Sequence, residues 1–189
     1  MLTQRLRPLM QLISLLTATL LLLWTFPLTV TAAAVIPTPH WGSWETKTIT
    51  YHYAGSSAYY RKVWQNAARQ WNQTGTVRLK SVKTAQRAHV VVRVNTKKTG
   101  YTGLTHSRYH AQRPVHKIVG AKASLNHKVL AKHRYTQKQR ANVAAHEFGH
   151  VLGLGHSKCK KSVMHATNRY AVVNRQDRLA IKRAYRKRR

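Results

Sequence analysis

Residues 146–156 carry three histidines at a spacing that limits what this chain can fold into. The segment reads His-Glu-Phe-Gly-His-Val-Leu-Gly-Leu-Gly-His. Residues four apart share one face of a helix, so His146 and His150 can direct two imidazole rings at one point. Gly153 stands where that helix would end, and glycine permits the sharp turn with positive φ that brings back His156. The segment therefore predicts a three-histidine metal site at a helix end.

The number of ligands indicates a catalytic zinc ion. Catalytic zinc sites have three protein ligands and one open position, whereas structural zinc sites are closed by four protein ligands. Glu147 follows the first ligand and can reach a water molecule in the open position, where a carboxylate acts as a general base. The alternative is three solvated histidines on a helix, but the chain has 3 acidic residues in total, and this alternative leaves Glu147 unexplained.

The extended pattern His-Glu-x-x-His-x-x-Gly-x-x-His, followed by a turn containing Met164, resembles the metzincin zinc endopeptidases. Ser157 after the third histidine, and the short step to Met164, resemble the matrixin branch. The resemblance covers about Thr46–Tyr185. It implies an α+β fold, a sandwich of the α/β type, with a twisted, mostly parallel sheet and an antiparallel edge strand. Two long helices, the active-site helix, the Met-turn and a C-terminal helix complete that fold.

The resemblance also implies roles for individual residues. His146, His150 and His156 hold zinc, and Glu147 passes a proton from the attacking water to the leaving amine of a protein or peptide substrate. Met164 forms a packed floor beneath the metal and is not a ligand. On the last helix, Asp177 supports the Met-turn backbone. No carboxylate is left to orient the zinc histidines, so we expect backbone carbonyl groups to do so.

Further metal sites are less well supported. Animal matrixins carry calcium and a second zinc in the region that corresponds to residues 99–115. Calcium needs oxygen ligands, usually carboxylates, and this region has none, so we expect no calcium. A second zinc held by histidines alone stays open, and so does a metal contact of Cys159, whose alternative is an ordinary loop thiol. The candidate histidines are His106, His110, His116 and His127.

The first residues of the chain have the composition of an export signal. Residues 1–34 combine Arg5 and Arg7, a Leu-rich run and the small residues Ala32–Ala34. A retained N-terminal anchor is the alternative, and both place the rest of the chain outside the cell. Residues 35–189 are expected to form one catalytic domain with a basic C-terminal tail. One cysteine excludes an intramolecular disulfide, and we expect a secreted monomer.

The net charge of +31 indicates polyanionic surroundings or partners. Anionic cell-wall polymers or a membrane surface suit an exported protein better than nucleic acid does. Adaptation to acidic surroundings, where carboxylates lose their charge, is a further explanation.

The sequence leaves two functions open. The first is an exported zinc endopeptidase; the second is a non-catalytic cationic envelope-binding protein on a metalloprotease scaffold. The presence of Glu147 favours the first.

Periodicity predicts the elements around the motif. Strands are expected at 48–53, 77–82, 88–94 and 117–125. The resemblance to matrixins implies that the last is the edge strand above the cleft, with which an extended substrate can pair. Residues 99–115 are expected to form a long loop. Helices are expected at 58–72, at 136–152 with a Thr136–Gln139 capping box, and at 175–186.

Overall fold

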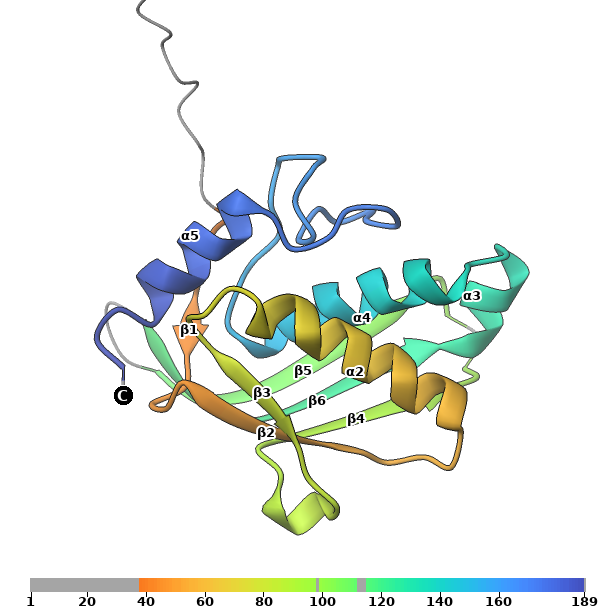
Figure 1. The fold of residues 1–189 in the computed structure, drawn as a ribbon, viewed down its shortest axis with the longest axis horizontal. Coiled ribbons are helices and arrows are strands. Elements are labelled where there is room, and N and C mark those ends of the chain that lie inside the picture. Colours follow the sequence, from red (N-terminus) through yellow and green to blue (C-terminus); the bar gives the residue numbers. More distant parts are fainter. Residues whose placement is uncertain (1–37, 98, 112–114, 189) are drawn as a thin grey trace, which may run out of the picture. The chain divides into compact units, whose positions relative to one another are not determined.

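The computed structural model describes residues 38–97, 99–111 and 115–188, and a six-stranded sheet forms its centre (Figure 1). Four strand pairings are parallel, and β5–β6 is antiparallel. The predicted mostly parallel sheet with an antiparallel edge strand is therefore confirmed. The strands are β1 (Gly42–Ser43), β2 (Thr48–Tyr53), β3 (Arg78–Ser81), β4 (Val90–Asn95), β5 (Gly103–His110) and β6 (His116–Asn126).

The two long helices lie side by side on one face of the sheet (Figure 1). They are α2 (Ala58–Asn72) and α4 (Gln137–Val151), and the shorter helices are α3 (His127–Lys132) and α5 (Arg175–Ala184). Trp64 and Trp71 of α2 are fully buried. The Trp71 indole donates a hydrogen bond to the Ala145 carbonyl of α4 at 2.8 Å. These tryptophans are core residues, and their helical spacing puts both on the buried face of α2.

The sheet has one face against the helices and one face toward solvent. Along β2, Ile49 and Tyr51 are buried against the helices, whereas Thr50 and His52 alternate with them on the other face. The strand register keeps this alternation across the sheet, because side chains of paired residues point to the same face. The helices thus cover the apolar face and leave a polar one, called here the outer face.

The prediction of a loop at 99–115 was wrong, because this segment contains the eight-residue strand β5. The prediction of 117–125 as the edge strand was also wrong. Its strand, β6, pairs with β4 on one side and with β5 on the other, so β5 is the edge. The reason is that an edge strand beside an open cleft buries little on either face. No apolar run in the sequence indicates this strand. Its sequence signal is the alternation of less and more exposed positions from Gly103 to Arg108.

The helix ends agree with the capping signals. Thr136 accepts a hydrogen bond from the Gln139 amide, and Gln139 accepts one from the Thr136 amide, so the predicted capping box is present. Asn174 and Asp177 form a second capping box at the start of α5. Both helices begin where the sequence predicted, and α5 ends slightly earlier.

The described residues belong to one compact unit, Val35–Arg189. Within them, no helix is both long and apolar enough to cross a membrane. The predicted export signal or anchor at 1–34 lies outside the described residues. Its cleavage and its effect on location stay predictions.

Candidate active site

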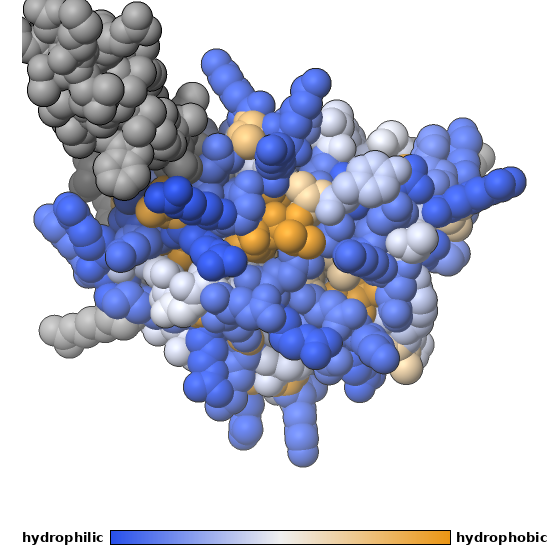
Figure 2. All heavy atoms as spheres, turned by 45° about the horizontal axis from the view of Figure 1, so that its top comes forward, coloured by the Kyte–Doolittle hydropathy of each residue, from blue (hydrophilic) through white to orange (hydrophobic). Residues whose placement is uncertain are grey.

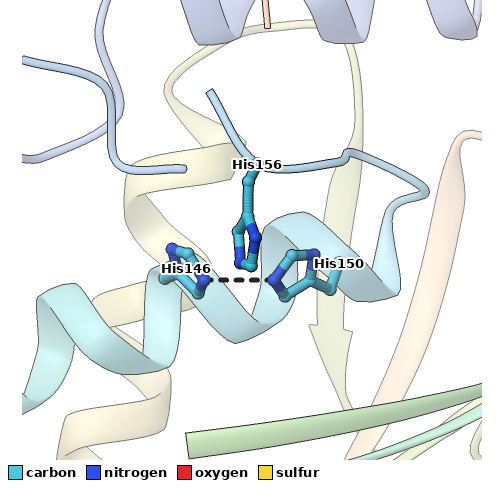
Figure 3. Close-up of side chains that lie close together, drawn as sticks. All are labelled: His146, His150 and His156. Atoms are coloured by element: carbon cyan, nitrogen blue, oxygen red, sulfur yellow. Dashed lines mark hydrogen bonds between the residues drawn. The ribbon is translucent and has the colours of Figure 1, made fainter. Parts of the chain in front are cut away.

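Helix α4 positions the first three residues of the site. His146 and His150 lie one turn apart, and their Nε2 atoms are 3.0 Å from each other, joined by the dashed line in Figure 3. Glu147 lies on the same turn and is buried. A helix places these side chains by local geometry alone, which is why the motif was readable in the sequence.

A turn at Gly153 brings His156 to the other two histidines. Gly153 has a φ of 89°, and a Cβ there would lie 1.9 Å from the carbonyl oxygen of Gly42. A side chain at this position would therefore meet both backbone strain and a backbone clash. The three rings point toward one another (Figure 3), and one nitrogen of each lies within 4.8 Å of the others.

Backbone carbonyl groups orient two of the three rings. Nδ1 of His146 donates to the Val163 carbonyl, and Nδ1 of His150 donates to the Leu154 carbonyl, each at 2.9 Å. A carbonyl oxygen only accepts, so both neutral rings carry their proton on Nδ1. This is the orientation by backbone groups that the lack of acidic residues predicted.

The same hydrogen bonds show that the site suits a zinc ion. Both Nε2 atoms are unprotonated and lie 3.0 Å apart, so they cannot hydrogen-bond to each other, and a shared cation would remove their repulsion. Burial, with the neighbouring His150 and His156, lowers the pKa of His146 to about 4. Burial also lowers the pKa of His150. Both rings stay in the neutral form that binds metal at neutral pH.

The turn that contains Met164 packs against the part of α4 that carries two of the histidines. Met164 is fully buried, and the Ser157 amide donates to its carbonyl at 2.9 Å. A Cβ on Gly149 would lie 2.1 Å from the Met164 sulfur. Gly149 stands between the first two metal ligands in the sequence, so its missing side chain lets Met164 pack against this stretch of α4. The sequence analysis did not find this role of Gly149.

Asp177 connects the start of α5 to the Met-turn. Its side chain is fully buried and accepts hydrogen bonds from the Val163 amide at 3.1 Å, the Thr38 hydroxyl at 2.8 Å and the Ser162 hydroxyl at 2.5 Å. The Asn174 amide donates to the same carboxylate at 3.1 Å. The Val163 carbonyl in turn orients His146. Asp177 therefore holds the backbone that aligns a metal ligand.

Two residues of β5 contact Glu147, and the sequence analysis missed both. The Thr105 hydroxyl lies 2.6 Å from Glu147 Oε2 and 3.3 Å from the Glu147 carbonyl oxygen. A Cβ on Gly103 would lie 2.4 Å from Oε1, so the glycine makes room for the carboxylate. Burial raises the pKa of Glu147 to about 7, and the Thr105 hydrogen bond opposes that shift. The sequence signal that could have indicated this contact is the presence of small residues, Gly103 and Thr105, at alternate positions of β5.

These residues line a cleft of about 910 Å³ between α4 and β5. The three histidines, Glu147 and Thr105 are in its wall, and residues 166–168 lie on its other side. One part of the rim is aromatic. The Tyr109 ring stacks on His116 with centroids 4.9 Å apart, and it meets Trp41 edge-on at 5.5 Å. The cleft offers room for several residues of a bound peptide beside the histidines.

The other histidines and Cys159 do not join this cluster. Among the described residues, His146, His150 and His156 form the only group of three or more potential ligands that could hold a metal. His127 contacts the Tyr60 hydroxyl at 2.9 Å, and Cys159 is a free, half-buried thiol. His106 lies on β5, and the absence of a calcium site stays a prediction.

The fold and the site together define a zinc-peptidase domain of the metzincin type. A mostly parallel sheet with an antiparallel edge, a helix carrying two ligands, a glycine turn to the third and a buried methionine below them make up this arrangement. Comparison with protein families matches residues 43–186 to the model described as Matrixin, and the chain belongs to that family. Comparison with curated proteins gave no significant match.

Proposed function

We propose that this protein is an exported zinc endopeptidase that hydrolyses peptide bonds with Glu147 as the general base. Membership of the matrixin family supports the peptidase class. The role of Glu147 as the base is supported by its position, because Glu147 lines the same cleft as the three histidines. A buried carboxylate with a pKa of about 7 is suited to exchange a proton at neutral pH.

The metal and Glu147 have separate tasks. Zinc held by His146, His150 and His156 would polarise the scissile carbonyl group and activate a water molecule. Glu147 accepts the proton of the attacking water and delivers it to the leaving amine. Thr105 keeps the carboxylate in one orientation, and Asp177 keeps His146 in place through Val163. Met164 and Gly153 are structural supports.

Strand β5 provides the pairing edge for the substrate. It forms one wall of the cleft, and its free side carries backbone groups that no other described strand pairs with. An extended peptide can add to such an edge by main-chain hydrogen bonds, which give affinity with little demand on sequence. Pairing with the substrate, which the sequence analysis expected of residues 117–125, is therefore proposed for residues 103–110.

Residues 1–34 are proposed to direct export, either as a cleaved signal or as an anchor, and residues 35–189 to act outside the cell as one monomeric catalytic domain. The charge of +31 is proposed to retain the enzyme at an anionic envelope, either wall polymer or membrane surface. The non-catalytic alternative does not account for a buried carboxylate that contacts Thr105 in the cleft, so the enzyme is preferred.

Hydrolysis of unfolded casein tests the proposal. The purified protein should cleave casein, a zinc chelator should stop cleavage, and added zinc should restore it. Glu147→Gln should bind zinc and remain inactive, whereas Glu45→Gln, at an exposed glutamate on the surface, should retain full activity. If the protein bound zinc and cleaved nothing, or if Glu147→Gln were active, the proposed mechanism would be wrong.

A further inference from the structure

The outer face of the sheet carries basic side chains from neighbouring strands. Register places His106 of β5 opposite Lys122 of β6, and places Arg93 of β4 beside Ser124 of β6. Arg93, His106 and Lys122 are exposed. The three carboxylates lie elsewhere. Glu147 and Asp177 are buried on the helix side, and Glu45 forms the only ion pair among the described residues, with Lys117. Within the described part of the chain, Arg93 and Lys122 therefore have no carboxylate partner.

A recess of about 110 Å³ lies among these side chains and adjoins the catalytic cleft at the start of β5, where Tyr101, Gly103 and Leu104 line both. Water occupies about 30 Å³ per molecule, so the recess is large enough for one phosphate group. The residues that line it include Arg93, Lys97, His106 and Lys122, together with Tyr101 and uncharged residues. The side-chain amide of Asn126 donates a hydrogen bond of 2.9 Å to the Lys97 carbonyl. This bond holds Lys97, which follows β4, at the rim of the recess. The recess is thus a shaped site, not only a charged surface.

Arg108 extends the cationic row beyond the recess. It lies on β5 opposite Gly120, and a Cβ on Gly120 would be 2.7 Å from the Arg108 Nη2 atom. The missing side chain lets the guanidinium group lie across β6. Arg108 is two residues beyond His106 on the same face, so the cations continue along β5 from the recess. A ligand with repeated negative charges can follow that line.

We propose that the outer face binds a linear phosphodiester polymer and seats one of its phosphate groups in the recess beside Arg93 and Lys122. Charge alone does not select this face, because hydrophilic side chains also cover most of the helix side shown in Figure 2. The recess favours it, since Arg93, Lys97 and Lys122 line a cavity that a phosphate group on a flexible chain can enter. The larger recess on the helix side has two such residues, Lys138 and Arg178. This site acts independently of Glu147 and would hold the enzyme on its polymer while the cleft stays open.

Two other anionic partners fit the face less well. Surface binding to a membrane combines charge with inserted apolar side chains. Apart from Tyr109 at the rim of the cleft, the described strands β5 and β6 expose few large hydrophobic residues, namely Leu104 and Val119. Binding of single-stranded nucleic acid uses aromatic rings as platforms for the bases. Tyr101 lines the recess and is exposed, but it is a single ring, and no Trp, Tyr or Phe points outward from the described part of these strands to continue a row of platforms. A polymer of phosphate groups without bases suits the face best.

Binding of labelled poly(glycerol phosphate) to the purified protein, measured over a range of salt concentrations, tests the site. Arg93→Gln combined with Lys122→Gln should weaken binding by at least about tenfold and make the dependence of log Kd on log salt less steep by roughly one to two. The control removes the same charge from the helix side through Lys62→Gln and Lys132→Gln, both exposed. That control should change Kd by less than about twofold. Unchanged casein hydrolysis shows that each variant is folded.

Three outcomes would overturn the proposal. Equal weakening by both double variants would mean that net charge alone binds the polymer. Vesicles containing phosphatidylglycerol carry the same glycerol phosphate group at a membrane surface. If they bound through Arg93 and Lys122 and the polymer did not, a membrane would be the partner. An oligonucleotide of equal phosphate number that bound more tightly through these residues would identify a nucleic-acid site. If the double variant were unfolded, Lys97→Gln, at an exposed loop residue, should still weaken polymer binding.

Discussion

The Thr105 hydroxyl donates a hydrogen bond of 2.6 Å to the Glu147 carboxylate and so connects the edge strand directly to the active-site helix. The hydroxyl also lies within 3.3 Å of the Glu147 carbonyl oxygen, so two acceptors of one residue fix its direction. Gly103, two residues earlier on β5, leaves room for the other carboxylate oxygen. The strand that is proposed to bind substrate therefore also orients the proposed base.

Replacement of Thr105 should impair turnover more than substrate binding. Thr105→Val keeps the shape of the side chain and removes the hydroxyl, so the carboxylate loses its orientation. A hydrogen bond to a charged group is worth about 1.5–3 kcal/mol, so kcat on a peptide substrate should fall by about ten- to a hundredfold with KM nearly unchanged. Thr105→Ser keeps the hydroxyl and should recover most of kcat. Equal kcat for the valine variant and the original protein would contradict the orienting role.

Replacement of Gly153 should damage both stability and zinc binding. Gly153→Ala places a Cβ 1.9 Å from the Gly42 carbonyl oxygen, at a φ of 89°. The clash and the strain should destabilise the fold by at least about 3 kcal/mol. Thermal unfolding and zinc content measure the two effects. Gly75→Ala is the matched control, because Gly75 also has a positive φ, of 70°, but no atom lies within 4 Å of the added Cβ. The control should lose about 1 kcal/mol and retain zinc.

Removal of the negative charge at Asp177 should loosen the Met-turn. In Asp177→Asn, one amide nitrogen would face donors that now bind the carboxylate, and the site is fully buried. The free energy of unfolding should fall by about 2–4 kcal/mol, with weaker zinc binding because Val163 orients His146. Denaturant titration with and without zinc measures both. Glu45→Gln changes an exposed ion pair and should shift stability by less than about 1 kcal/mol. Similar losses in the two variants would argue against this role of Asp177.

Zinc should stabilise the folded protein through the three histidines. At a free zinc concentration about 100 times Kd, a ligand that binds only the folded state adds about 2.7 kcal/mol to the free energy of unfolding. A chelator should therefore lower the melting temperature of the original protein. His150→Ala removes one ligand and should abolish this chelator-induced shift. A melting temperature that is the same with and without the chelator would exclude a zinc ion bound at this cluster.

The sequence was most informative where structure depends on neighbours in the chain. The spacing of His146 and His150 acts within one helix, and the capping box of Thr136 and Gln139 spans four residues, so both follow from local geometry. The buried tryptophans of α2 followed from helical periodicity. Residues 99–115 gave a weaker signal, the alternation from Gly103 to Arg108, since β5 is half exposed and contains polar residues on both faces.

The metal-binding motif, the turn at Gly153 and the mostly parallel sheet could be inferred from the amino-acid sequence, because each depends on a short-range pattern or on a family motif. The contact of Thr105 with Glu147, and the recess that Arg93 and Lys122 share, became visible with the three-dimensional fold. The first pair is separated by 42 residues, and the second depends on strand register. Register is set when the whole sheet buries its apolar face against α2 and α4, and no local pattern contains that information.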